Sequence, residues 1–245
     1  MLETPIIIKR GAKSEAEKPF WISYADLMTA LMVLFLVVMS VALLAVTKTV
    51  SEIERQRTQR EQDIAKLLDE VQAAADRYPG VKVDKDRNVI DFGDKAHFEL
   101  GKFSLNADQA RLLRAFVPEV LAIARDDLGQ KWLKQIVVEG FASPEGDYLY
   151  NLNLSLERSQ RVLCVLLTPP YPDERAMTSA ELEQVRDLFL VGGYSYNGAK
   201  YNAATASYDE SRRVELRLEF LGIGETRPSK AAAPPGNFGK CALGG

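Results

Sequence analysis

One uncharged apolar stretch, residues 27–46, constrains this chain more than any other part of its 245 residues. The hydrocarbon core of a bilayer is about 30 Å thick, and roughly 20 apolar residues cross it in a helix that rises about 1.5 Å per residue. Phe20, Trp21 and Tyr24 precede the stretch and are typical of the aromatic belt at a membrane interface. The sequence therefore predicts a single membrane-spanning helix over residues 20–46.

A cleaved signal peptide is the alternative, because Ser40-Val41-Ala42 fits a cleavage site of small residues. The apolar stretch is longer than the roughly 7–15 residues usual in a signal peptide and has an acidic residue at its head, which favours a retained anchor. Basic residues flank both ends, so the positive-inside rule does not decide the orientation. Because of the kind of domain that follows, we expect residues 1–19 to form a cytoplasmic tail.

Asp26 is the one charged residue between Phe20 and Val46. A carboxylate inside a membrane helix costs about 2.5–3.5 kcal/mol on insertion scales, so such residues usually mark a function. Asp26 lies near the start of the helix, and one interpretation is a solvated carboxylate at the interface. The other is a carboxylate that faces a partner helix or a narrow aqueous path and alternates between protonated and charged forms.

The residues around Asp26, from Trp21 to Met32, resemble the membrane helix of MotB-type stator subunits, which opens with W-x-x-x-[YF]-[AS]-D-x-[ML]-[TS]. Trp21 stands one residue closer to the Tyr-Ala-Asp motif than in some members. The resemblance implies that Asp26 carries the ion, supported by Tyr24 and Thr29, and that two copies lie inside a pentamer of a MotA-like channel subunit. We expect protons, because a lone carboxylate suffices for them, whereas sodium needs further oxygen ligands.

Residues 47–79 are expected to form a linker helix that ends at Pro79-Gly80. Apolar residues recur on one face, but the polar stretch from Glu54 to Asp63 interrupts them. We favour a solvated spacer; the alternative is a self-pairing segment that regulates ion flow, as plug segments of MotB-type proteins do. The apolar positions are Ile53, Ile64, Leu67, Leu68, Val71 and Ala74.

Residues 80–222 alternate strand-like and helix-like stretches, which predicts an α+β domain with helices on one face of a mixed β-sheet. Residues 223–245 are expected to form a C-terminal tail, and Asn106 is the candidate N-cap of the first helix. The expected elements are a hairpin of Val81–Val83 and Asn88–Phe92, helices Asn106–Ala124 and Asn151–Leu167, and strands Gln135–Gly140, Asp187–Gly193 and Arg213–Phe220.

Three features of this region, in the family's order, resemble the OmpA-like peptidoglycan-binding domain. The first is Phe98-Glu99-Leu100 to Ala107, a strand and loop that lead into a helix. The second is the N-x-x-L-S-x-x-R string of Asn151, Leu154, Ser155 and Arg158. The third is a Gly193-Tyr194 turn followed by Ser211-Arg212-Arg213-Val214-Glu215-Leu216. The resemblance implies a peptidoglycan-binding site formed by Ser143, Tyr150, Asn151, Leu154 and Arg158.

Arg158 and Asn151 have side chains that suit such a site. A guanidinium holds a carboxylate of a peptide stem with two hydrogen bonds, and Asn151, two turns away on nearly the same helix face, offers a donor and an acceptor. The alternative interpretations are that Arg158 is a surface charge and that Leu154 is a core residue.

The loop after the central strand departs from the family pattern. The family usually has G-H-T-D there, whereas this chain has Gly140-Phe141-Ala142-Ser143, so Ser143 replaces the expected acid. Glu145 and Asp147 lie close by in the sequence and are candidates to substitute for it. We therefore expect wall binding that is weaker or differently specific.

The remaining chemistry-bearing residues are few. Cys164 and Cys241 allow a disulfide within the chain, a disulfide across a dimer, or two free thiols, and two thiols cannot build a zinc site alone. His97, the lone histidine, is interpreted as structural. The sequence has no nucleophile elbow, phosphate loop or metal cluster, so neither an enzyme nor a cofactor or metal is expected. The net charge of -3 does not indicate nucleic-acid binding.

Together these features predict a peptidoglycan-anchored stator subunit of a proton-driven rotary motor, which spans the bacterial inner membrane once with its C-terminal domain in the periplasm. Within the MotB-type family, the chain resembles the subunits of Zorya anti-phage defence systems. The reasons are its compact size, the run from Pro19 to Leu31, Ser143 and the cysteine-bearing tail. Two alternatives stay open: a flagellar stator subunit of MotB type, and a passive envelope anchor in which Asp26 only pairs helices.

Overall fold

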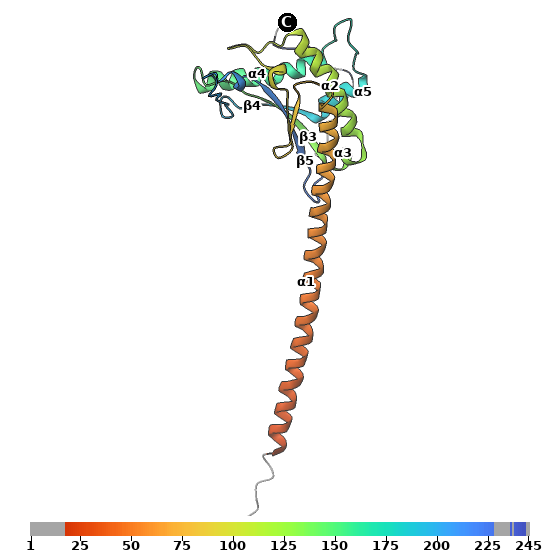
Figure 1. Ribbon diagram of the computed structural model, residues 1–245. Coiled ribbons are helices and arrows are strands. Elements are labelled where there is room, and N and C mark those ends of the chain that lie inside the picture. Colours follow the sequence, from red (N-terminus) through yellow and green to blue (C-terminus); the bar gives the residue numbers. More distant parts are fainter. Residues whose placement is uncertain (1–17, 228–235, 237, 244–245) are drawn as a thin grey trace, which may run out of the picture. The chain divides into compact units, whose positions relative to one another are not determined.

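The computed structural model describes residues 18–227, 236 and 238–243 (Figure 1). The chain divides into two units between Gln56 and Arg57. Helix α1 (Lys18–Ala75) begins in the first unit and ends in the second. The sequence predicted a membrane helix and a separate linker helix, but the structure has one uninterrupted helix. The reason is that residues 20–78 contain neither proline nor glycine, so nothing in this stretch ends a helix.

The N-terminal part of α1 has the surface of a membrane helix. Among the described residues, α1 is the helix that is long and apolar enough to cross a bilayer. Its apolar side chains over residues 27–46 are exposed on all sides. The hydroxyls of Thr29 and Ser40 donate to the carbonyl oxygens of Ala25 and Leu36 at 2.5 and 2.7 Å. These hydroxyls therefore have partners without water, as a hydrocarbon environment requires.

The second unit is built on a five-stranded mixed sheet in the order β1-β2-β5-β3-β4. Neighbouring strands are antiparallel except β3 and β4, which run parallel. The strands are β1 (Lys82–Asp84), β2 (Val89–Asp91), β3 (Leu133–Gly140), β4 (Phe189–Gly193) and β5 (Val214–Phe220). The predicted mixed sheet is confirmed, and the hairpin lies where the sequence indicated.

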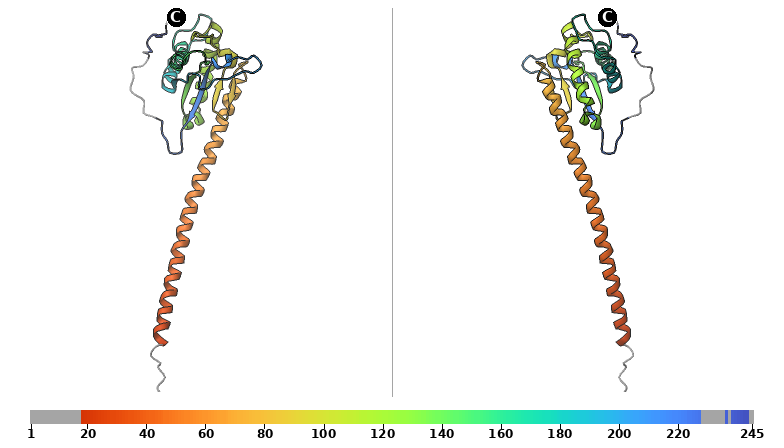
Figure 2. Two further views of the ribbon diagram at one scale, coloured as in Figure 1. Left: turned by 90° about the vertical axis from the view of Figure 1, so that its left-hand side faces the viewer. Right: turned by 90° about the vertical axis from the view of Figure 1, so that its right-hand side faces the viewer.

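The two faces of the sheet differ in chemistry. On one face of β3 and β5, alternate residues such as Ile136, Val138 and Leu216 are buried in a core shared with the helices. On the opposite face most of the alternate residues are polar, and Arg217 donates to both carboxylate oxygens of Glu139 at 2.6 and 2.9 Å. Since α4 (Tyr148–Leu167) contacts β3 and β4 from the apolar side, the unit has the predicted helix and sheet layers (Figure 2).

Capping residues explain where the helices begin. Asn106 forms a capping box with Gln109, which confirms it as the N-cap of α2. Thr178 and Glu181 form a second box that starts α5. The predicted strand Asp187–Gly193 is present as β4 but begins at Phe189, because Asp187 and Leu188 complete α5. The strand expected at Phe98–Leu100 was wrong, since these residues lie in a loop after η1. The helices are α2 (Ala107–Arg125), α3 (Asp127–Trp132), α4 (Tyr148–Leu167) and α5 (Ser179–Leu188), with short 3-10 helices η1 (Gly93–Ala96) and η2 (Asp209–Ser211).

The C-terminal turns of α1 belong to the second unit. Leu67, Leu68 and Val71 are buried in its core, so the expected solvated spacer does not describe this stretch. The expected domain start at residue 80 lies inside the compact unit, which begins at Arg57. The side-chain oxygens of buried Asp63 accept hydrogen bonds from Lys131 and Trp132, both at 2.9 Å, and from Gln59 at 2.8 Å. We call this group the Asp63 clamp, because it joins α1 to the end of α3.

Replacing Asp63 by asparagine is expected to lower the free energy of unfolding of the second unit by about 2 kcal/mol at pH 7. Hydrogen bonds from Lys131, Trp132 and Gln59 hold the pKa of Asp63 at about 2, against its ordinary value of 3.8. Because the folded-state pKa is depressed, this contribution is present above about pH 4 and is lost as the pH falls through about 2. Urea unfolding followed by tryptophan fluorescence should show a difference at pH 3 about half that at pH 7.

Asp69→Asn is the matched control, since Asp69 lies on the same helix with its side chain 67 % exposed and paired with Lys85. It should change the free energy of unfolding by less than about 0.5 kcal/mol. Equal losses for the two variants would contradict the Asp63 clamp.

Candidate functional site

The predicted peptidoglycan-binding residues gather where α4 begins, between the loops of residues 98–106 and 141–147. Oδ1 of Asp147 accepts the N–H of Tyr150 at 2.8 Å, which starts α4 three residues earlier than expected. The side-chain amide of buried Asn151 donates to the carbonyl oxygens of Glu145 and Asp147 at 2.9 and 3.2 Å. Asn151 therefore closes the turn that leads into the helix.

The buried side chain of Arg158 connects the two loops. Its guanidinium donates to three backbone carbonyls, through Nε to Lys102 at 2.9 Å, Nη1 to Phe141 at 2.8 Å and Nη2 to Glu99 at 3.1 Å. The side chain is fully buried, so the interpretation of Arg158 as a surface charge was wrong. Burial, and then the charge of Arg212, lower the pKa of Arg158 to about 10, which leaves the guanidinium charged at neutral pH.

Of the five predicted site residues, four are buried and one is exposed. Ser143 is 3 % and Leu154 5 % exposed, so Leu154 is a core residue in this structure. Tyr150 is 52 % exposed and is the one whose side chain meets solvent broadly. The structure thus brings all five together, but it places most of them behind the surface that a polymer would touch.

The connection between β4 and β5, residues 194–213, forms a further side of the candidate site, which was not predicted from the sequence. The ring of Phe141 stacks on Tyr194 with centroids 5.4 Å apart. The backbone N–H of Ser195 donates to the hydroxyl of Ser155 at 2.9 Å, and the Ser195 hydroxyl donates to the carbonyl of Tyr148 at 3.0 Å. In the sequence, the one indication that this connection contributes to the site is the recurrence of tyrosine after Gly193.

Two glycines let α4 approach the ends of the parallel strands. Gly140 and Gly193 are paired in the register of β3 and β4. A Cβ on Gly140 would lie 1.9 Å from the carbonyl oxygen of Ser155, and a Cβ on Gly193 would lie 2.8 Å from the backbone nitrogen of Leu156. Glycine is therefore required here by close contact with the α4 backbone.

Gly140→Ala is expected to lower the free energy of unfolding by about 3 kcal/mol, because the added methyl group meets backbone rather than a flexible side chain. Urea titration of the purified protein measures the loss. Gly222→Ala is the control, since a Cβ there meets Glu225 only at an ordinary 3.4 Å. An unchanged midpoint for Gly140→Ala would contradict the close helix–sheet contact.

The two cysteines are paired within one chain in this structure. The Cα atoms of Cys164 on α4 and Cys241 in the tail lie 5.4 Å apart and their sulfurs are bonded. Arg161 donates to the carbonyl oxygen of Leu243 at 3.1 Å, and its guanidinium lies 5.5 Å from the ring centroid of Phe103. The end of the described tail is therefore held against α4.

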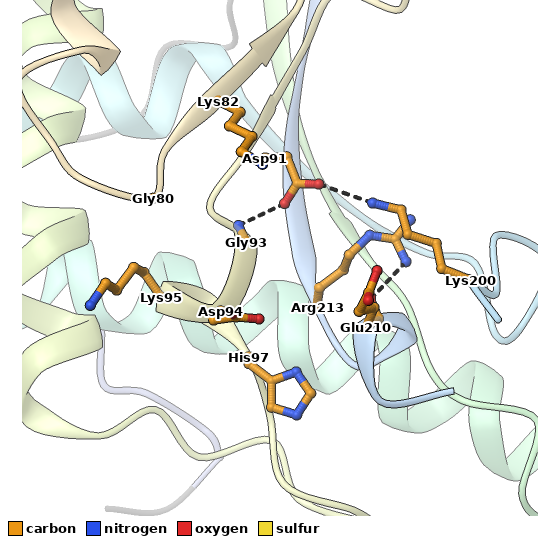
Figure 3. A pocket seen from close by; sticks show the side chains of 10 residues that line it. All are labelled: Gly80, Lys82, Asp91, Gly93, Asp94, Lys95, His97, Lys200, Glu210 and Arg213. Atoms are coloured by element: carbon orange, nitrogen blue, oxygen red, sulfur yellow. Dashed lines mark hydrogen bonds and ion pairs between the residues drawn. The ribbon is translucent and has the colours of Figure 1, made fainter. Parts of the chain in front are cut away.

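A cavity of about 420 Å³ opens beside β2 and is lined by charges of both signs (Figure 3). Asp91 accepts hydrogen bonds from the backbone N–H of Gly93 at 2.8 Å and from Lys200 at 3.0 Å. Arg213 donates to Glu215 at 2.7 Å. These pairs attach the 194–213 connection to the sheet. Beside them, burial and then Arg212 lower the pKa of His97, which favours a neutral, structural imidazole at this position.

In the first unit, Asp26 lies on the exposed surface of α1. Ser23, Tyr24, Leu27 and Ala30 surround it in a shallow pocket of the helix surface. Because the side chains of Ser23 and Ala30 are small, the Asp26 carboxylate is accessible to a neighbouring helix on this face of α1. Tyr24 is 54 % exposed, whereas the Thr29 hydroxyl is bound to its own helix backbone. The predicted ion-carrying group is thus accessible from outside the helix.

Comparisons with known proteins match both units. The model of the family described as "Membrane MotB of proton-channel complex MotA/MotB" matches residues 8–52. The Zorya protein ZorB of Escherichia coli O139:H28 is 45% identical over 221 residues, which cover 90% of this chain and 88% of that protein.

Two solved structures are similar to the second unit at low identity. The periplasmic domain of Helicobacter pylori MotB shares 12% identity over 59% of this chain and 90% of its own, with a TM-score of 0.40. The cell wall anchor of the T6SS from Pseudomonas aeruginosa shares 18% identity over 61% of this chain and 94% of its own, with a TM-score of 0.38.

Proposed function

Because this chain belongs to the family of the Zorya protein ZorB, we propose that it is the peptidoglycan-anchored, stator-like subunit of a proton-driven rotary membrane motor in an anti-phage defence system. The observation that carries the proposal is a single acidic residue, Asp26, in the membrane-length apolar part of α1. The match of residues 8–52 to the MotB family supports assigning ion transport to this segment.

In the proposed assembly, two copies of the chain lie inside a pentamer of a MotA-like subunit, ZorA. The exposed apolar surface of α1 supplies the contact with that ring, and Asp26 takes up and releases the proton between them, supported by Tyr24 and Thr29. The N-terminus is cytoplasmic and the second unit periplasmic, in the bacterial inner membrane. One charge that crosses the membrane potential carries about 2.3 kcal/mol per 100 mV, enough to bias a conformational cycle.

Wall binding is assigned to the second unit, at the loops of residues 98–106 and 141–147. Four buried residues support the loops from the interior, and Tyr150 contributes exposed surface. The buried residues are Ser143, Asn151, Leu154 and Arg158. Attachment to the wall would keep the subunit stationary while its ring partner rotates. The anchor is as necessary as the ion path, because a stator that is free to rotate exerts no torque.

Two measurements on the intact protein test these roles separately. The full-length chain in detergent should co-sediment with purified sacculi. Its complex with the MotA-like subunit, reconstituted in proteoliposomes, should take up protons when a membrane potential is applied. Failure to co-sediment would contradict the anchor, and an assembled complex without proton uptake would contradict the motor.

A further inference from the structure

Two exposed tyrosines at the start of α4 and the half-buried Tyr196 form an aromatic surface. Tyr148, Leu149 and Tyr150, the first three residues of the helix, are 41, 73 and 52 % exposed. Tyr150 reaches toward the loop of residues 98–106, where a Cβ on Gly101 would lie 3.4 Å from its hydroxyl. On the other side, the ring of Tyr148 meets Tyr196 edge to face with centroids 5.6 Å apart. We call Tyr148, Tyr150 and Tyr196 the tyrosine strip.

The strip is held in place by polar contacts behind it. The side-chain amide of Asn197, itself exposed, donates to the Tyr148 hydroxyl at 3.3 Å. The Ser195 hydroxyl fixes the Tyr148 backbone carbonyl, and Asp147 fixes the N–H of Tyr150. Tyrosine gives a large amphipathic contact area at a low cost in conformational entropy, and these contacts lower that cost further.

The charges around the strip disfavour an anionic ligand. The segments 98–103, 141–151 and 194–198 contain one basic residue, Lys102, which is ion-paired with Glu99. Arg158 lies behind the surface with its donors on three backbone carbonyls. Glu145 and Asp147 are exposed and negative. Peptide stems, which carry several carboxylates, therefore find little here to bind, and Ser143 offers no charge to their amino group.

Uncharged sugar rings fit the same surface well. A hexosamine ring has an apolar face of C–H groups that packs on the electron-rich face of an aromatic ring, while its hydroxyl and acetamido groups need hydrogen-bonding partners. The tyrosine hydroxyls and Asn197 supply donors and acceptors at the rim. We propose that the tyrosine strip binds the glycan strand of peptidoglycan. The inference rests on the proposed wall binding and assigns it to the sugar chain.

The test uses full-length protein in detergent and two immobilised probes. One is intact sacculi; the other is glycan strands from which an amidase has removed the peptide stems and on which the lactyl carboxylates so exposed have been converted to neutral methylamides. Wild-type protein should bind both. Tyr148→Ala/Tyr150→Ala should bind the bare strands at least about tenfold more weakly, because each lost ring removes its stacking contact. Tyr171→Ala is the control, since Tyr171 is 45 % exposed but lies outside the three segments.

Each outcome bears on one of the two proposals. Binding to sacculi but not to bare strands would overturn the glycan inference and leave wall binding intact. Binding to neither would overturn the proposed anchor itself. Unweakened binding of bare strands by the double variant would remove the tyrosine strip from the site. If the double variant unfolds at a lower temperature than wild type, the single Tyr150→Ala variant, expected to show a smaller loss in the same assay, replaces it.

Discussion

Asp26→Asn is expected to abolish proton uptake by the reconstituted complex, and phage protection with it, while the chain still assembles with its channel partner. Asparagine nearly matches the size and hydrogen-bonding capacity of aspartate but cannot take up and release a proton. Asp26 is the one acidic residue within residues 20–46, so no nearby carboxylate replaces it. Uptake is measured with a pH-sensitive dye in proteoliposomes under an applied potential, and assembly by co-purification of the partner.

Two further variants make this result specific. Asp69→Asn makes the same chemical change at an exposed position of the second unit and should leave uptake unchanged. Asp26→Glu keeps a carboxylate one methylene further from the helix and should retain part of the uptake. Full uptake and full protection by Asp26→Asn would rule out ion transport through this residue. That result would favour a passive anchor in which Asp26 only pairs helices.

Beyond the mixed sheet as a whole, the parts of the fold that the sequence located most precisely are those whose partners lie nearby in the chain. Asn106 and its capping partner Gln109 are three residues apart, and the β1–β2 hairpin is equally local. The same kind of signal is present at Thr178 and Glu181, where a T-x-x-E box starts α5, a helix that was not predicted. Local capping chemistry is therefore sufficient to locate the starts of α2 and α5.

The parts that were wrong depend on contacts between distant residues. The apolar stripe of the linker indicated a helix correctly, but its burial depends on a core assembled from the rest of the unit. Asp63, for example, binds Lys131 and Trp132, which are 68 and 69 residues away. The partners of Arg158 lie 17, 56 and 59 residues away and are backbone carbonyls, which leave no trace in the residue pattern. The family string thus located Arg158 without indicating that it is buried.

Arg158→Ala is expected to lower the free energy of unfolding of the second unit by about 3–5 kcal/mol and to abolish co-sedimentation with sacculi. The substitution leaves the carbonyls of Glu99, Lys102 and Phe141 without their donors and opens a cavity beneath Phe98, whose ring centroid lies 5.1 Å from the guanidinium. The loops of residues 98–106 and 141–147 then lose the group that joins them. Urea unfolding and sacculus binding measure the two effects.

The matched variants separate this joining role from direct contact with the wall. Arg158→Lys keeps the charge but cannot direct donors to three carbonyls at once, so it should lose most of the stability as well. Arg111→Ala, at a half-exposed arginine of α2, should change the free energy of unfolding by less than about 1 kcal/mol. If Arg158→Ala kept wild-type stability but lost sacculus binding, Arg158 would touch the wall directly. If both variants of Arg158 lost stability in parallel with binding, the guanidinium would act by holding the two loops together, and the surface they present would make the contact.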